Sequence, residues 1–172
     1  ERVAWWLHIV GILIFLNYLY FSKHLHILLA FPNTFYADLN AKGKLDNLES
    51  VTNEVKLMMD PNADPFAAPT DTSDVPAKFG ASDVQDLNWV QLLNAYSCTE
   101  CGRCTSSCPA NQTGKKLSPR KIMMDTRDRL EEVGKNIDLN KGVFVDDGKS
   151  LLNDYISTEE LWACTSCNAC VE

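Results

Sequence analysis

Hydrophobic residues are concentrated at the N-terminal end of this chain. Over residues 3–30, 21 of 28 positions are hydrophobic, and no Asp, Glu, Lys or Arg lies between Val3 and Ser22. A helix of about 20 residues rises about 30 Å, which is the thickness of the hydrocarbon core of a bilayer. The pattern therefore predicts one transmembrane helix over residues 1–31.

The ends of this segment have the residues expected at the two surfaces of a membrane. Aromatic side chains that can act as interfacial anchors lie near both ends: Trp5, Trp6, Tyr18 and Tyr20. Pro32 should end the helix, because the residue before a proline disfavours the α conformation. A cleaved signal peptide is the alternative, but only Arg2 precedes the apolar run, the run is long, and no small-residue cleavage site follows it. A spanning helix is the preferred interpretation.

Residues 32–81 are predicted to form a partly helical connector between the transmembrane helix and the C-terminal domain. Within it, residues 44–59 have helical spacing with one packing stripe, formed by Leu45, Leu48, Val51 and Val55. Between Asp60 and Gly80, prolines alternate with aspartates and small residues, which is typical of an extended connection across a surface. No ligand is implied by the acidic residues of this region.

Helix-start signals recur through residues 82–172. Each pairs a capping side chain with a partner one to three residues later: Ser82 with Gln85, Ser118 with Pro119, and Ser157 with Glu160. The first of these helices should reach about Tyr96, and the second should stop at Gly134. The chain is therefore predicted to be all-α, with one transmembrane helix followed by an α-helical domain over residues 82–172.

Composition and charge exclude several classes of protein. The 172 residues are 45% hydrophobic and carry 16 Lys+Arg against 23 Asp+Glu, for a net charge of -7. Such a chain is neither wholly disordered nor a basic nucleic-acid binder. Lys23, Lys42 and Lys44 follow the apolar segment, whereas only Arg2 precedes it. The positive-inside rule then places the C-terminal part on the cytoplasmic side. The chain is expected in the inner (cytoplasmic) membrane.

Seven cysteines, all in the C-terminal half, supply the clearest chemistry. The first cysteine motif (residues 98–108) contains Cys98, Cys101, Cys104 and Cys108, and Pro109 follows it. Its spacing, C-x2-C-x2-C-x3-C-P, is that of the bacterial [4Fe–4S] ferredoxins. A zinc site would more often use two separated C-x2-C pairs, and so dense a run could not form disulfides within itself without strain. Iron–sulfur binding is the preferred interpretation.

The second cysteine motif (residues 164–170) contains Cys164, Cys167 and Cys170. Two [4Fe–4S] clusters need eight thiolates, and the eighth is expected at position 174, beyond the last residue of this sequence. In ferredoxins of this spacing the cysteine before the proline binds the other cluster. We therefore expect Cys108 to complete the cluster held by the second motif. The sequence is expected to be a fragment cut at both ends.

Basic residues lie between the two motifs: Lys115, Lys116, Arg120, Lys121, Arg127 and Arg129. This group could dock an acidic partner. It could equally be a solvated helix face interrupted by Asp125 and Asp128, or compensate locally for anionic clusters.

The three histidines of the chain, His8, His24 and His26, all lie in or near the apolar segment. In one continuous helix, the eighteen residues from His8 to His26 make about five whole turns, so both would face the same side about 27 Å apart. An ionisable group in a membrane span is by default a functional residue. A pair so placed could supply one axial ligand to each of two stacked b-type haems, with partner helices supplying the others. The alternative is that His8 makes a helix contact and His24 and His26 are interfacial.

Two stretches resemble known families. The segment from His8 through Ser22-Lys23-His24-Leu25-His26-Ile27 resembles a helix of the haem b gamma subunit of respiratory nitrate reductase. It is also similar to membrane iron–sulfur reductases that fuse such a domain to a heterodisulfide-reductase-type module. That resemblance implies that His8 and His26 ligate haem, in a bundle whose last helix is residues 1–31. Residues 82–172 resemble the α-helical dicluster domain of heterodisulfide reductase, the glycolate oxidase iron–sulfur subunit and, in part, the succinate dehydrogenase iron–sulfur subunit.

These features together predict electron transfer. Electrons would pass between the quinone pool, haem b, two [4Fe–4S] clusters and a soluble redox partner or substrate domain, within a membrane-bound oxidoreductase of several subunits. The chain offers no candidate acid–base or nucleophilic catalytic residue, so it is expected to be the electron-transfer part of such an enzyme. The alternative is a non-catalytic, membrane-tethered ferredoxin-like carrier without haem.

Overall fold

The chain folds into helices joined by turns. The computed structural model describes residues 1–41, 47–60, 78 and 80–171. These residues are mostly helical and include no strand, as the sequence predicts. In chain order the elements are α1 (Arg2–Leu19), η1 (Lys23–Leu25), α2 (His26–Phe35), α3 (Glu49–Met59), η2 (Val84–Asp86), α4 (Trp89–Ser97), α5 (Arg103–Ser106), α6 (Pro109–Gln112), α7 (Pro119–Leu139), η3 (Leu151–Tyr155) and α8 (Thr158–Trp162).

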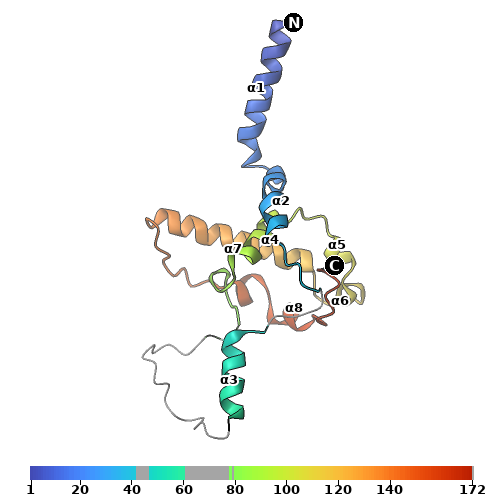
Figure 1. Cartoon of the computed structure of the whole chain (residues 1–172), viewed down its shortest axis with the longest axis vertical. Helices are drawn as coiled ribbons and strands as arrows, with labels where there is room; N and C mark the ends of the chain where they lie inside the picture. The colour runs from blue at the N-terminus through green and yellow to red at the C-terminus, as the bar shows by residue number, and fades with distance from the viewer. Residues whose placement is uncertain (42–46, 61–77, 79, 172) are drawn as a thin grey trace.

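The N-terminal helix α1 projects away from the rest of the chain (Figure 1). It is long and apolar enough to cross a membrane by length and composition, with a mean hydropathy of 1.5 over 18 residues. Most of its large apolar side chains are exposed, and Leu19 is its only buried residue. Exposure of so many apolar groups to water would be unfavourable, so this surface requires a lipid or protein environment.

The prediction of one continuous helix over residues 1–31 is wrong. Helix α1 ends at Leu19, and Ser22 is extended, with φ −110° and ψ 160°. The Ser22 hydroxyl accepts a hydrogen bond from the His24 amide and so caps the next turn, η1. A serine that caps a new turn offers the backbone an alternative to the α-helix, and this local competition interrupts the segment.

Pro32 does not end a helix, contrary to the prediction. Helix α2 includes Pro32 and continues to Phe35, where the Tyr36 amide donates to the Pro32 carbonyl. A proline inside a helix removes one hydrogen bond and crowds the carbonyl four residues earlier, so it is unfavourable there. Contacts with α4 support the turn that follows: Asn33 donates from Nδ2 to Oδ1 of Asn94 at 2.7 Å. Packing against a neighbouring helix therefore outweighs the local preference.

Helix α4 begins later than the sequence predicts. Asn88 and Gln91 form its capping box, whereas the expected pair of Ser82 and Gln85 does not cap a helix. Asp83 and Asp86 form a separate capping box around the short turn η2. At the start of α4, the ring of Trp89 lies edge-on to Tyr36, with centroids 4.6 Å apart. These contacts join α4 to α2.

Helix α7 is the longest helix and lies across the domain (Figure 1). Its start agrees with the prediction, because Ser118 caps it and Pro119 occupies the first position. It does not stop at Gly134 but continues to Leu139, since Gly134 keeps a helical conformation and does not take a positive φ. Farther along, the Asn136 side chain hydrogen-bonds the backbone of Val145, which supports this last stretch.

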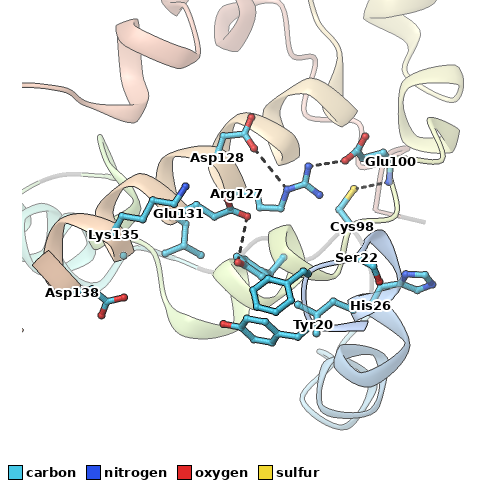
Figure 2. A pocket seen from close by; sticks show the side chains of 15 residues that line it. Tyr20, Ser22, His26, Cys98, Glu100, Arg127, Asp128, Glu131, Lys135 and Asp138 are labelled. Atoms are coloured by element: carbon cyan, nitrogen blue, oxygen red, sulfur yellow. Dashed lines mark hydrogen bonds and ion pairs between the residues drawn. The ribbon is translucent and has the colours of Figure 1, made fainter. Parts of the chain in front are cut away.

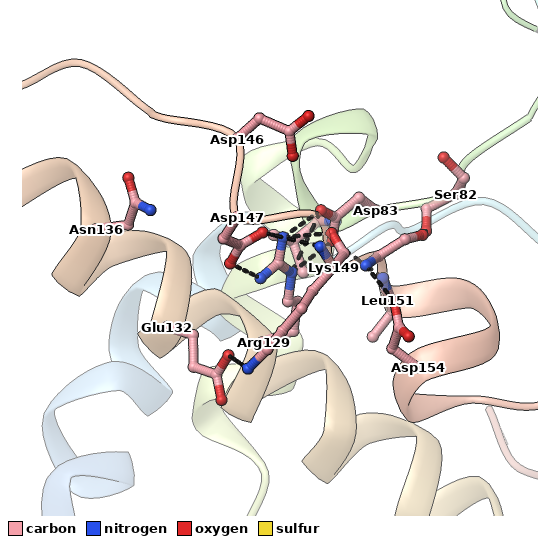
Figure 3. Close-up of polar contacts among 12 residues, drawn as sticks. Ser82, Asp83, Arg129, Glu132, Asn136, Asp146, Asp147, Lys149, Leu151 and Asp154 are labelled. Carbon is pink, nitrogen blue, oxygen red and sulfur yellow. Dashed lines mark hydrogen bonds and ion pairs between the residues drawn. The ribbon is translucent and has the colours of Figure 1, made fainter.

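A buried arginine on α7 connects this helix to two other segments of the chain (Figure 3). Arg129 has no exposed side-chain surface and bonds the carboxylates of Asp83 and Asp147, at 2.8 and 2.6 Å. It also donates to the carbonyl of Lys149. The prediction that the basic residues between the two motifs face solvent or dock a partner is therefore wrong for Arg129. Its positive charge is balanced by Asp83 and Asp147 inside the fold.

The connector is described only in part. Helix α3 lies within the predicted segment 44–59, and its stripe residues Val51 and Val55 are exposed, so no packing partner covers them in the described residues. Leu45 lies outside the described residues, and so does most of the extended connection predicted over residues 60–80, namely residues 61–77 and 79.

Candidate iron–sulfur site

Helix ends position the first cysteine motif. Cys98 directly follows Ser97, the last residue of α4, and Cys108 precedes Pro109 at the start of α6. Between them, Thr105 in α5 hydrogen-bonds the Ser118 hydroxyl and accepts from the Arg120 amide, at 3.0 and 3.1 Å. The motif is therefore attached to the N-terminal end of α7.

The second cysteine motif is attached to the same helix. It follows α8, whose capping box of Ser157 and Glu160 agrees with the prediction. Lys121 on α7 bonds Asp125 on its own helix, the carbonyl of Tyr155 and the carboxylate of Glu160. Helix α7 thus holds both motifs.

The two motifs have the same backbone conformation. Glu100 and Ser166, each the second residue after the first cysteine, have positive φ angles of 57° and 51°. Gly102 and Asn168, each directly after the second cysteine, have φ of 79° and 59°. Left-handed conformations are uncommon for residues other than glycine, so their recurrence at two matched pairs of positions indicates a shared local structure.

Backbone amides point at sulfur in both motifs. The Glu100 amide donates to Sγ of Cys98, and the Ser166 amide donates to Sγ of Cys164, each over 3.4 Å. Amides aimed at sulfur stabilise a thiolate, because they place positive partial charge beside it. Each motif therefore bends its backbone so that it favours the anionic, metal-binding form of cysteine.

The middle cysteines are also stabilised as thiolates. Hydrogen bonds from the Arg103 side chain and amide, with help from Thr99, lower the pKa of Cys101 to about 7. The Ala169 amide and the Thr165 hydroxyl lower the pKa of Cys167. Because a cysteine must lose its proton to bind iron, both groups of contacts suit metal ligands.

Cys108 is the buried cysteine of the first motif, in which Cys98 and Cys104 are half-buried and Cys101 is exposed. It is buried, with 6% of its surface exposed, in an apolar cluster with Ala110 and Leu117, and Ala163 packs against this cluster. Ala163 immediately precedes Cys164 of the second motif. Partial desolvation raises the pKa of the Cys170 thiol, and neighbouring thiols, those of Cys164, Cys108 and Cys104, add to the rise. Cys108 therefore lies near the second motif.

All seven cysteines are free thiols, and none of them forms a disulfide. Within the described ranges, no three His, Cys, Asp or Glu side chains converge closely enough to hold a single metal ion. The fit to a cluster therefore rests on seven available sulfur donors and on the sulfur-directed amides shared by the two motifs. On those grounds the residues fit [4Fe–4S] clusters, which are held by cysteine thiolates.

The histidines are distributed over different elements. His8 lies in α1, His24 in η1 and His26 at the start of α2. The break at Ser22 removes the continuous helix on which the alignment of His8 with His26 depends. The rings of His24 and His26 are nearly parallel, with centroids 6.5 Å apart. Haem ligation by His8 and His26 stays a prediction.

An open cavity of about 900 Å³ lies between the end of α1, η1 and α7, beside Cys98 (Figure 2). Tyr20, Leu25 and Tyr96 contribute to its apolar wall. On the opposite wall, Arg127 bonds the carboxylate of Glu100 at 2.6 Å, which ties the left-handed turn of the first motif to α7.

Comparison with known proteins agrees with this geometry. Residues 97–172 match the 4Fe-4S dicluster domain family. The match includes both cysteine motifs of this dicluster domain and α7 between them, and it supports the two predicted [4Fe–4S] clusters. No solved structure matches the chain.

Several curated proteins are similar over most of the chain. One is "Probable iron-sulfur-binding oxidoreductase FadF" of Bacillus subtilis, 31% identical over 98% of this chain and 25% of the relative. Another is "EtfAB:quinone oxidoreductase" of Syntrophomonas wolfei, 27% identical over 100% of this chain and 23% of the relative. A third, "Probable membrane-anchored ferredoxin" of Chromohalobacter salexigens, is 31% identical over 59% of this chain and 17% of the relative. The chain thus spans about a quarter of the length of the first two.

Arg103 was not recognised from the sequence, and Arg127 was named there only as one of a basic group that could dock a partner, face solvent or compensate for anionic clusters. Arg103 donates from Nε to Sγ of Cys101 at 3.3 Å, and Arg127 binds Glu100. Arg103 lies between two cysteines of the motif, which is a signal that could have identified it. Arg127 lies 27 positions after Glu100, so only the fold reveals that contact.

Proposed function

We propose that this chain transfers electrons within a membrane-bound iron–sulfur oxidoreductase. The observation that carries the proposal is the repeated conformation of the two cysteine motifs, with left-handed residues at matched positions and amides directed at Cys98 and Cys164. When bound, [4Fe–4S] clusters supply one-electron transfer. The protein contributes the spacing of the two motifs along α7 and the groups around each sulfur.

We assign Cys98, Cys101 and Cys104 to one cluster. Cys164, Cys167 and Cys170 would hold the other, together with Cys108. One contact supports this exchange of Cys108: Ala163, the residue before Cys164, packs against the apolar cluster that contains Cys108. The eighth thiolate would come from outside this sequence.

Chemical analysis of the purified, cluster-loaded protein tests this function. We expect iron and sulfide for two cubanes, and two sets of EPR signals on reduction. A Cys101→Ser variant should affect one set and a Cys167→Ser variant the other, because each removes a ligand from a different motif. Zinc in place of iron, or signals from only one cluster, would contradict the proposal.

The membrane side of the pathway is proposed to involve quinone. Helix α1 has the length and hydropathy of a span, and a relative similar over the whole of this chain is described as a quinone oxidoreductase. The cysteine motifs would lie on the cytoplasmic side of the inner membrane. Electron exchange, in either direction, between the EPR-active centres and menaquinone or ubiquinone in liposomes tests the partner. Protease accessibility of the dicluster domain in inside-out vesicles tests the side.

Haem b is a second candidate cofactor, with His8 and His26 as ligands shared with helices outside this sequence. Similarity to the Bacillus relative extends over 98% of the chain and so includes this N-terminal segment. The native membrane complex should then have a reduced b-type α-band that His26→Ala removes, while His24→Ala serves as the matched control. An unchanged α-band in His26→Ala would exclude ligation by that residue.

A membrane-tethered carrier without haem is the alternative function. It is favoured by the similarity of 59% of the chain to a protein described as a membrane-anchored ferredoxin. The proposed oxidoreductase subunit and the tethered carrier differ in their optical spectra and in the composition of the native complex. A carrier would have iron–sulfur signals without an α-band and would purify without a substrate-reducing domain.

A further inference from the structure

Cys101 and Cys167 occupy corresponding positions in the two motifs, and their surroundings are almost the same. Each sulfur is approached by the amide two residues later, Arg103 or Ala169, and by a threonine hydroxyl two residues earlier. One difference remains. The Nε–H of Arg103 donates to Sγ of Cys101 at 3.3 Å, and the matching residue of the second motif is Ala169, which has no such group.

Other positive charge lies near the first motif as well. Arg120 places an Nη1 4.0 Å from where a Cβ on Gly102 would be, and the Arg127 guanidinium interacts electrostatically with Cys98. In the second motif, the hydrogen bonds of the described residues include none from an arginine or lysine to sulfur. Two lysines outside α8 bond its acidic residues: Lys116, in the loop before α7, bonds Glu159, and Lys121, on α7, bonds Glu160.

A guanidinium beside a cluster ligand changes the energies of the two oxidation states unequally. Reduction adds one negative charge to the cluster and its thiolates, so a cationic donor stabilises the reduced state more than the oxidised state. Hydrogen bonds to charged groups are also stronger than neutral ones. The reduction potential of a cluster beside Arg103 should therefore be higher than that of the same cluster without it.

We propose that Arg103 gives the cluster held by Cys98, Cys101 and Cys104 the higher reduction potential of the two. This inference rests on the proposed function, because it requires that both motifs hold clusters. In the favoured step one electron leaves the reduced centre of the second motif and reduces the oxidised centre of the first. No bond forms or breaks, and the total charge of the pair is unchanged.

The fold gives this step a direction in space. The first motif begins where α4 ends, and α4 packs against α2 through Asn33 and Asn94 and through Tyr36 and Trp89. Helix α2 is connected through η1 to the apolar helix α1. The higher-potential centre is thus the one next to the apolar segment, so electrons that arrive at the second motif move towards the membrane. The chain would deliver electrons to the lipid side.

EPR-monitored redox titration of the cluster-loaded protein tests this proposal. In the wild type, the signal that disappears in Cys101→Ser should be the one with the higher midpoint potential. Arg103→Gln should lower that midpoint by about 59 mV, a tenfold change in the reduced-to-oxidised ratio of a one-electron couple, and leave the other unchanged. Arg103→Lys should restore part of the shift. Lys56→Gln, with the same charge change on α3, is the matched control and should move neither midpoint.

The reciprocal substitution keeps the test decisive if Arg103→Gln loads poorly. Ala169→Arg places the guanidinium at the corresponding position of the second motif and should raise the midpoint of that cluster. Unchanged midpoints in both Arg103→Gln and Ala169→Arg, or a lower wild-type midpoint for the first cluster, would overturn the inference. Absence of one set of EPR signals in the wild type would instead overturn the proposed function.

Discussion

Arg129 donates from Nε and Nη2 to the carboxylate of Asp83, which lies 46 residues earlier in the chain (Figure 3). The same guanidinium binds Asp147 and the Lys149 carbonyl, so one buried side chain joins η2, α7 and the loop before η3. This loop leads through η3 to α8 and the second cysteine motif. The position of that motif therefore depends on a charge network that contains none of its ligands.

Removal of this arginine should destabilise the domain. Arg129→Met would leave the Asp83 and Asp147 carboxylates facing each other without their cation, and we expect the free energy of unfolding to fall by about 3 kcal/mol. Denaturant unfolding of the cluster-loaded protein measures the change. Lys115→Met, at an exposed position of the loop before α7, is the control and should change the free energy by less than about 0.5 kcal/mol. Equal effects of the two substitutions would contradict the role of the network.

The network should weaken in acid. Hydrogen bonds from Arg129 lower the pKa of Asp147 from its usual 3.8 to about 2. Burial alone would raise the pKa of Asp83, but the bonds and charge of Arg129, together with hydrogen bonds from the Val84 and Leu151 amides, outweigh burial and lower it. A carboxyl group with a lowered pKa in the folded state stabilises the fold fully above its unfolded pKa. That contribution is lost as the pH falls through its folded pKa.

The Asp147→Asn variant separates protonation of the Arg129 network from protonation of the cysteine ligands. The difference in unfolding free energy between wild type and Asp147→Asn should be constant from pH 7 to about pH 5 and shrink as the pH falls towards 2. Denaturant titrations at each pH measure it. A difference that grows in acid would have the wrong sign for this explanation.

Cys108 should matter more to the second motif than to its own. Cys108→Ser is expected to reduce the EPR signal that Cys167→Ser also removes. The reason is that Cys108 belongs to the apolar side-chain cluster against which Ala163, next to Cys164, packs. Cys104→Ser, in the same motif, is the matched control and should affect the other signal. If both substitutions remove the same signal, the exchange of ligands between the motifs is incorrect.

Gly102 should tolerate asparagine better than valine. Its φ is +79°, and Asn168 occupies the matched position of the second motif at +59°. An added Cβ at Gly102 would meet only Arg120 Nη1, at 4.0 Å, so the cost of substitution is conformational and not steric crowding. We expect Gly102→Val to cost about 1–2 kcal/mol and to lower iron content, and Gly102→Asn to cost less, because asparagine enters this region more readily.

Iron analysis and thermal unfolding of the two Gly102 variants measure this difference. A Gly102→Asn variant that loads as poorly as Gly102→Val would show that the second motif is not a guide to the conformation of the first.

Local signals in the sequence identified the parts of this protein that depend on near neighbours. The Ser118 cap, the capping box of Ser157 and Glu160, and the spacing of the cysteine motifs involve residues a few positions apart, and their chemistry is decided by side-chain type. Even so, local rules misplaced the start of α4 and the ends of α2 and α7, where competing caps and packing between helices decide the outcome.

By itself the sequence determined the helical class, the apolar N-terminal segment and the two motifs that match the 4Fe-4S dicluster domain family. Tertiary structure alone decided that Arg129 is buried between Asp83 and Asp147. These contacts join residues 46 and 18 positions apart. Burial and charge pairing act through space, so a pattern of neighbours along the chain cannot contain them.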